Sequence, residues 1–304
     1  MSEREEKLFV VAGASWNTGK AVARNLVDQG RRVRVITREA AKGEPWKAKG
    51  AEVAVANLKD ADALADALRG ASGAYLLMPR SFVEPDLRAH QDRMLDAIAR
   101  AVEASRVPHV VFLSSMGAQH PSGTGPIVAL HLAEERLRRI QGTVFSFVRI
   151  GFLMENIPTW AGARAPNIGK IPLAYDELLS FLPEDLKLPM IAVEDIARLA
   201  TSLLLDPPAA TQVVEIGGPP ISMNDAAEAI SRIIGRPAHV RRVPVADKFE
   251  MLVASGGPED LSRLYLEMLE GYESGHIGFE DGHRRVVGTT SIETVIRGVL
   301  GKPA

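Results

Sequence analysis

The chain has 304 residues, and its 36 Lys and Arg against 38 Asp and Glu give a formal net charge of −2. With 46% apolar and 24% charged residues, it has the composition of a globular protein with one large or two smaller domains. The absence of Cys excludes disulfides, thiolate metal sites and a thiol nucleophile. A near-neutral charge without a basic stripe argues against a nucleic-acid partner.

The first seven residues are mostly charged, whereas a secretory signal requires an apolar segment there. No apolar run approaches the roughly 18 residues that a membrane-spanning helix needs. The acidic and His residues near 276–283 match no defined metal-site spacing. We therefore expect a soluble, cytoplasmic monomer or homodimer that binds neither metal, membrane nor nucleic acid.

Short β-rich runs alternate with longer helical patterns in the first half of the chain, which is typical of a parallel sheet covered by helices. The expected strands are residues 8–12, 32–37, 52–56, 73–78, 110–114 and 144–149. The expected helices are residues 17–29, 45–49, 61–68, 87–104 and 128–140. This order predicts an α/β fold of the Rossmann type, a doubly wound parallel sheet with six strands in this part of the chain.

Repeated prolines interrupt the pattern after Gly151, and a smaller substructure is expected there. A helix at 193–205 and a strand at 212–216 are expected to rejoin the main sheet. Ser222 with Asp225 predicts a helix at 222–234, and Thr290 with Glu293 predicts a final helix. The predicted domains are an NADP-binding Rossmann domain (1–151 plus about 190–218) and a discontinuous C-terminal α/β substrate domain (152–189 plus about 219–304).

The turn between the first strand and the first helix is glycine-rich, as in dinucleotide sites. In such turns one Gly allows a tight bend, a second leaves room for the pyrophosphate, and a third lets helix and strand pack closely. Gly13 and Gly19 fit the first and third roles, but Trp16 occupies the middle place. The residues expected to contact the cofactor here are Gly13, Ser15, Trp16, Asn17, Thr18 and Gly19. The alternative is a βα turn that binds no nucleotide, with the indole closing the site.

The end of the second expected strand distinguishes between the two nicotinamide cofactors. A carboxylate there would hold a ribose 2′-hydroxyl, whereas Arg38, with Lys42 close behind, suits a 2′-phosphate. The sequence therefore favours NADP(H) over NAD(H), although a solvated surface Arg is the alternative. Asn57 and Leu58, after the third strand, are candidates to flank the adenine.

Taken together, several motifs resemble the NmrA-like, atypical short-chain dehydrogenase/reductase family. They are Gly13-x-x-x-Asn17-Thr18-Gly19, Thr37-Arg38, Ser114-Ser115-Met116-Gly117-Ala118, Arg149-x-Gly151-Phe152-x-Met154-Glu155-Asn156 and Val193-Glu194-Asp195-Ile196-Ala197. The resemblance implies a Rossmann domain with a small substrate domain and NADP(H) binding. Members include quinone and azo-dye reductases as well as redox-sensing regulators without catalytic activity.

The usual Tyr-x-x-x-Lys pair of short-chain dehydrogenases has no counterpart, because none of the four Tyr has a Lys four residues later. The helix after the fifth strand instead carries His131 with Glu135, a pattern closer to the quinone-reductase-like branch. A Glu beside His131 would orient the ring and raise its pKa, so that the imidazole donates a proton to a carbonyl oxygen. A purely structural His is the alternative.

Further candidates lie where strands end, because ligands bind at the carboxyl edge of a doubly wound sheet. Met78, Pro79, Ser114, Ser115 and Phe152 lie at such ends; of these, Met78, Pro79, Ser114 and Phe152 are expected, with His131, to contact the cofactor, and Ser115 with His131 to act in catalysis. The residues expected to contact an apolar or aromatic carbonyl substrate are Phe152, Asn156, Trp160 and Tyr175. The sequence favours an NADPH-dependent reductase of a quinone-like or conjugated ketone. The alternative is a non-catalytic NADP(H)-binding sensor that acts through a protein partner.

Overall fold

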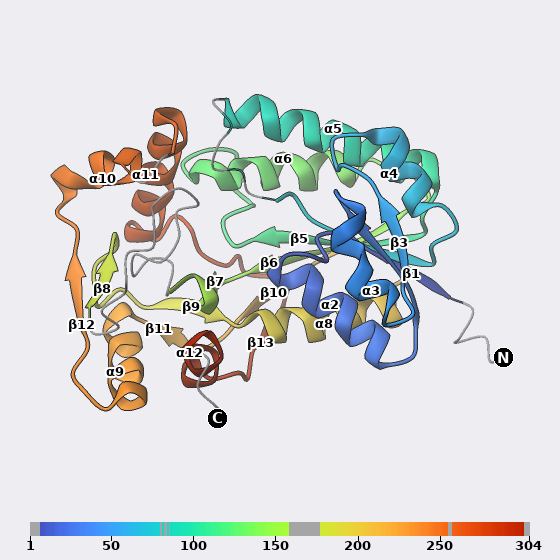
Figure 1. Ribbon diagram of the computed structural model, residues 1–304. Helices are drawn as coiled ribbons and strands as arrows, with labels where there is room; N and C mark the ends of the chain where they lie inside the picture. Colours follow the sequence, from blue (N-terminus) through green and yellow to red (C-terminus); the bar gives the residue numbers. More distant parts are fainter. Residues whose placement is uncertain are drawn as a thin grey trace.

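An eight-stranded sheet, parallel at every pairing, forms the centre of the molecule (Figure 1). The computed structural model describes residues 7–79, 81, 84, 86–157, 177–254 and 257–300. The strands, in spatial order, are β13 (Arg284–Val287), β10 (Gln212–Gly217), β6 (Val144–Ile150), β5 (His109–Ser115), β4 (Gly73–Leu76), β1 (Leu8–Val11), β2 (Arg32–Thr37) and β3 (Glu52–Val55). The order reverses direction at β1 and β4, which confirms the predicted doubly wound Rossmann-type α/β fold.

Helices cover both faces of this sheet (Figure 1). One layer contains α2 (Asn17–Asp28) and α8 (Val193–Leu205), and the other contains α4 (Ala61–Leu68), α5 (Leu87–Ser105) and α6 (Val128–Leu137). The short α3 (Glu44–Lys47) follows the 3₁₀ helix η1 (Ala40–Gly43). Because both faces are covered, the central strands are largely buried; all four residues of β1, for example, are apolar and buried.

A second apolar core forms beside the main one, built largely from the C-terminal half of the chain. Its strands are β7 (Phe152–Leu153), β9 (Leu188–Ile191) and β11 (Pro220–Ile221) in one small sheet, and β8 (Glu177–Ser180) with β12 (His239–Arg242) in another. Its helices are α9 (Met223–Ile234), α11 (Glu259–Glu273) and α12 (Ile292–Leu300), and α10 (Lys248–Ala254) packs against α11. The short 3₁₀ helices are η2 (Gly125–Ile127), η3 (Met154–Asn156) and η4 (Val245–Asp247).

Local capping signals account for several helix ends. Ser222 and Asp225 form the predicted capping box at the start of α9. The predicted final helix is present as α12, but Ser291 rather than Thr290 caps its start. The Ser291 hydroxyl accepts the Thr294 N–H at 3.2 Å. The Thr290 N–H instead donates to Asp195 at 3.1 Å, which ties the start of α12 to α8.

Strand β13 belongs to the main sheet, although its residues lie in the segment that the sequence assigned to the substrate domain. It pairs with β10 and becomes the outermost strand of the main sheet. Its sequence, Arg-Arg-Val-Val, lacks the apolar run of a central strand. The strand is held instead by its ladder and by Arg285, which donates to the buried Glu215 of β10 at 3.0 Å. Among the described residues, no helix is long and apolar enough to cross a membrane.

Candidate functional site

The turn after β1 has the backbone that a dinucleotide-binding turn requires. Gly13 has φ = +70°, and a Cβ added there would lie 2.8 Å from Leu77 Cδ2. A Cβ on Gly19 would lie only 2.4 Å from the Ala12 carbonyl oxygen, so this position of α2 accepts nothing larger than Gly. The first and third glycine roles of a dinucleotide turn are therefore both present.

The N-terminus of α2 is open to an anion. Trp16 is the N-cap residue, its side chain makes no capping hydrogen bond, and the first turn contains no acidic residue. The N–H groups of Asn17, Thr18 and Gly19 precede the first intrahelical bond, which Lys20 N donates to Trp16 O at 2.8 Å. Ser15, Trp16 and Asn17 are exposed at this end of the helix, whereas Thr18 and Gly19 are buried, and the positive end of the helix dipole lies at this exposed turn.

The three described tyrosines, Tyr75, Tyr265 and Tyr272, lie in different environments. Tyr75 on β4 is fully buried, and burial raises the pKa of its phenol. Tyr272 is buried in the second core, with its ring edge-on to Phe152 at a centroid distance of 6.0 Å. Tyr265 lies on the partly buried face of α11. Tyr175 lies outside the described residues.

Arg38, at the end of β2, is exposed, as a group that binds a 2′-phosphate would have to be. The charged side chains beside it are of both signs, because Glu39 lies next to Lys42. Lys42 forms an ion pair with Glu39 at 2.7 Å, and Lys42 and Arg38 together hold the pKa of the Glu39 carboxyl below its usual value. The side chain of Asn57 accepts the Lys59 N–H at 3.1 Å. Leu58 is buried in the main core, with 9% of its surface exposed.

His131 on α6 is held by the backbone rather than by a carboxylate. Its Nδ1 lies 2.9 Å from the Ala118 carbonyl oxygen, and because a carbonyl can only accept, Nδ1 carries the hydrogen. The expected contact with Glu135 is wrong: that carboxylate is exposed and its described partner is Arg139 at 3.8 Å. The Ala118 carbonyl therefore fixes the ring through Nδ1 and leaves Nε2 on the other side of the ring, and the residue as a whole is partly buried.

Ser114 and Ser115 have different environments, because successive residues of a strand face opposite sides of the sheet. The buried Ser114 hydroxyl donates to Glu134 of α6 at 2.6 Å, so it is engaged in the core rather than free for a ligand. The Ser115 hydroxyl donates to the Met116 carbonyl at 3.0 Å and remains partly exposed at the carboxyl edge of the sheet. Only Ser115 is therefore accessible for a substrate oxygen.

A buried charge network that was not among the predicted features surrounds Ser114. Glu134 accepts two hydrogen bonds from Arg149 of β6, at 3.0 and 2.8 Å, and a third from Arg138 at 3.1 Å. Arg149 also donates to Glu280 at 2.8 Å. In the sheet, Ser114, Arg149, Glu215 and Arg285 lie in register across four neighbouring strands. The network thus binds the segment before β13 to the strands and to α6.

The remaining residues predicted to contact the cofactor or the substrate differ in how far they are buried. Met78 and Pro79 follow β4 and are partly exposed, Asn156 in η3 is partly exposed, and Phe152 is buried against the second core. Glu155, between them in the Phe-x-Met-Glu-Asn motif, accepts the Val193 N–H at 2.8 Å and so caps α8. Trp160 lies outside the described residues.

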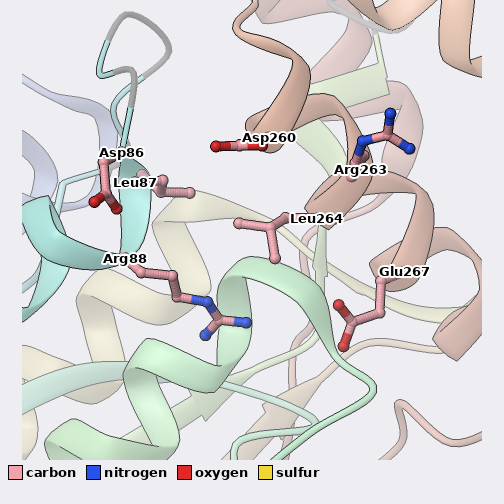
Figure 2. Close-up of a pocket in the computed structure, with 7 residues that line it drawn as sticks. All are labelled: Asp86, Leu87, Arg88, Asp260, Arg263, Leu264 and Glu267. Atoms are coloured by element: carbon pink, nitrogen blue, oxygen red, sulfur yellow. The ribbon is translucent and has the colours of Figure 1, made fainter.

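A hollow separates the start of α5 from α11, at the edge of the sheet where the strands end (Figure 2). Its volume is about 280 Å³. Leu87 and Leu264 point into it from opposite sides in Figure 2, and charged side chains surround them. The charged residues are Asp86, Arg88, Asp260, Arg263 and Glu267. Among the described residues, no group of three or more His, Asp or Glu is arranged to hold a metal ion.

The sheet order, the glycine turn and the open helix N-terminus together define a protein of the dinucleotide-binding Rossmann class. A family model described as the NmrA-like family matches residues 5–278. The chain therefore belongs to the NmrA-like family, in agreement with the resemblance of its motifs.

Individual relatives within this family are distant. An NAD(P)H azoreductase of Xenophilus azovorans is 26% identical over 259 residues, covering 84% of each chain. A (4-alkanoyl-5-oxo-2,5-dihydrofuran-3-yl)methyl phosphate reductase of Streptomyces griseus is 24% identical, covering 98% of this chain and 94% of the relative. An NADPH-dependent quinone oxidoreductase from Escherichia coli, solved with NADPH, has a TM-score of 0.77 at 20% identity, covering 96% of this chain and 99% of that one. This last likeness supports the fold.

Proposed function

We propose that this protein is an NADPH-dependent reductase of quinone-like or conjugated carbonyl compounds. The observation that carries the proposal is the turn 13–19, whose open helix N-terminus lies at the same sheet edge as His131 and Ser115. The named activities of the distant relatives, reduction of azo compounds, quinones and a dihydrofuranone phosphate, involve electron-poor conjugated systems and support the substrate class.

The residues present fit a dinucleotide. Gly13 supplies the bend, Gly19 lets α2 approach β1 to backbone contact, and the uncapped N–H groups of α2 suit a diphosphate. Arg38, which is exposed at the end of β2, would hold a 2′-phosphate through charge-assisted hydrogen bonds. The bound nicotinamide would supply a hydride to a conjugated carbon of the substrate.

The chain itself would handle the charge that then appears on the substrate oxygen. His131, with Nδ1 fixed on the Ala118 carbonyl, presents Nε2 as the atom that gives a proton when the ring is protonated. Ser115 would donate a hydrogen bond to the same oxygen after leaving the Met116 carbonyl. A quinone can also take its proton from water, so we expect less dependence on His131 for quinones than for enones.

The test is NADPH oxidation with a panel of quinones and enones, together with direct measurement of NADPH binding by calorimetry. We expect turnover by the wild-type protein, and a roughly 100-fold lower kcat for an enone in His131→Ala, since general acid catalysis contributes about that much. His239→Ala is a matched control, because His239 lies on the outer strand β12 with its side chain 66% exposed. NADPH binding without turnover of any compound would contradict the proposal and favour the sensor interpretation.

A further inference from the structure

Trp16 stands where a dinucleotide turn ordinarily has its second glycine. The backbone at this position does not require glycine, because φ is −120° and ψ is 163°, which is extended and open to any residue. The Trp16 N–H donates to the Gly13 carbonyl at 2.8 Å, and the Trp16 carbonyl accepts from Lys20 N. A glycine would therefore serve here only by leaving space, and Trp16 itself is 50% exposed.

The chemistry of the indole is compatible with an anion at the same place. The usual N-cap residues, Ser, Thr, Asp and Asn, accept hydrogen bonds from the N–H groups of the first helical turn and so compete with a bound phosphate. Tryptophan has no acceptor; its Nε1–H is only a donor. Trp16 therefore makes no capping bond to the N–H groups of the first turn, and its side chain brings a donor rather than an acceptor to this end of the helix.

We infer that the Trp16 side chain is a cofactor-binding group, which contacts the diphosphate of the bound dinucleotide through its N–H and ring and shields it from water. The inference rests on the proposed function. It follows from position, because the side chain of an N-cap residue lies beside the N–H groups that receive an anion at a helix N-terminus. Trp16 is one of the exposed large apolar residues among those the structure describes, so its side chain is accessible for such a contact.

The experiment compares dissociation constants for NADPH, measured by calorimetry, in wild type and three variants. Trp16→Gly restores the ordinary glycine, Trp16→Phe keeps a ring without the donor, and Trp16→Asp introduces an acceptor and a negative charge. We expect affinity to fall about tenfold in Trp16→Gly, the worth of one hydrogen bond to a charged group, with Trp16→Phe between it and wild type. Trp16→Asp should bind weakest, because its carboxylate caps the helix and repels phosphate.

Adenosine 2′-monophosphate is the matched control ligand, since it contains the 2′-phosphate but no diphosphate. Its affinity should be the same in all four proteins. A second readout uses Trp46→Phe/Trp160→Phe, which leaves Trp16 as the sole tryptophan; its fluorescence should be quenched by NADP⁺ but not by adenosine 2′-monophosphate. Circular dichroism confirms that each variant is folded.

The outcomes separate the two proposals. If the wild-type protein binds NADPH, but Trp16→Gly binds it equally or more tightly, the contact is refuted and the proposed function is unaffected. If only Trp16→Gly binds NADPH, the indole blocks the site, which overturns both the inference and the proposed activity of the natural chain. If neither protein binds a dinucleotide, the proposed function itself fails.

Discussion

Replacement of Arg149 by Met should destabilise the fold strongly, because it leaves a buried carboxylate without its main partner. Glu134 is only 2% exposed and accepts two hydrogen bonds from Arg149. Breaking a buried ion pair by removing one partner typically costs about 3–5 kcal/mol. Arg138 remains near Glu134 at 3.1 Å, and Glu280 has a half-exposed side chain that water can solvate. We therefore expect the lower end of the range, about 3 kcal/mol.

The assay is urea unfolding followed by circular dichroism, with a thermal scan alongside. An unfolding entropy of about 2.1 cal/mol/K per residue over 304 residues converts 3 kcal/mol into a fall in Tm of about 5 °C. Arg149→Met/Glu134→Gln should recover part of the loss, since the amide removes the buried charge and can still accept from Ser114. Arg136→Met is the control, because Arg136 and its partner Asp96 are both about half exposed and the change should cost under about 1 kcal/mol.

A loss below about 1 kcal/mol in Arg149→Met would refute this reasoning, because it would mean that the Glu134 carboxylate does not depend on Arg149 for its stability in the core. The same conclusion would follow if the double variant were less stable than Arg149→Met. Either result would contradict the description of Glu134 and Arg149 as a buried pair that fastens α6 to the sheet.

Three further predictions concern single groups. The pKa of His109 is lowered to about 4 by burial beside Ser146, so stability should be complete above pH 6.5 and fall by about 3 kcal/mol towards pH 4; urea unfolding across that range checks it, and a flat profile would contradict it. Glu155→Ala should cost about 1 kcal/mol by removing the cap on Val193, whereas Glu155→Gln keeps an acceptor and should cost less; equal losses would disprove the capping role. Arg38→Ala should weaken NADPH binding at least tenfold more than NADH binding by calorimetry, and equal losses would exclude the 2′-phosphate assignment.

The sequence predicted best those strands and helices whose positions follow from the burial of apolar residues. Central parallel strands are covered on both faces, so they appear as short apolar runs such as residues 8–11, and the intervening helices carry their own end signals. Helix α4 has the predicted bounds because Asp60 caps its start, accepting the Ala63 N–H at 3.1 Å. Strand β13 was not predicted, because it is an outer strand with two Arg and lacks an apolar run. It is held by its pairing with β10, some 70 residues away in the chain, and a local sequence pattern contains no information about such a distant partner.

In the candidate site too, features set by neighbouring residues in the chain were predicted, whereas contacts between distant segments were not. The glycine turn is local, so its residues and conformation agree with the prediction. The predicted pairing of His131 with Glu135 relied on the i, i+4 spacing. This spacing brings two side chains near one another on a helix, but it does not determine which group the histidine ring binds. The Ala118 carbonyl, from a loop that precedes η2, competes successfully because it is fixed beside the ring at 2.9 Å.

The buried network had a detectable signal in the sequence that spacing rules do not use. Glu134 lies between Leu130 and Leu137 on the apolar face of its helix, and Arg149 interrupts the apolar strand Val144–Ile150. A charge on a face that must be buried requires a partner of opposite sign, since burial of an unpaired charge is prohibitive. One such acid and one such base in consecutive elements predict each other as partners. On the same reasoning Glu134, not the exposed Glu135, is the acid that fixes α6, and with it His131, against the sheet.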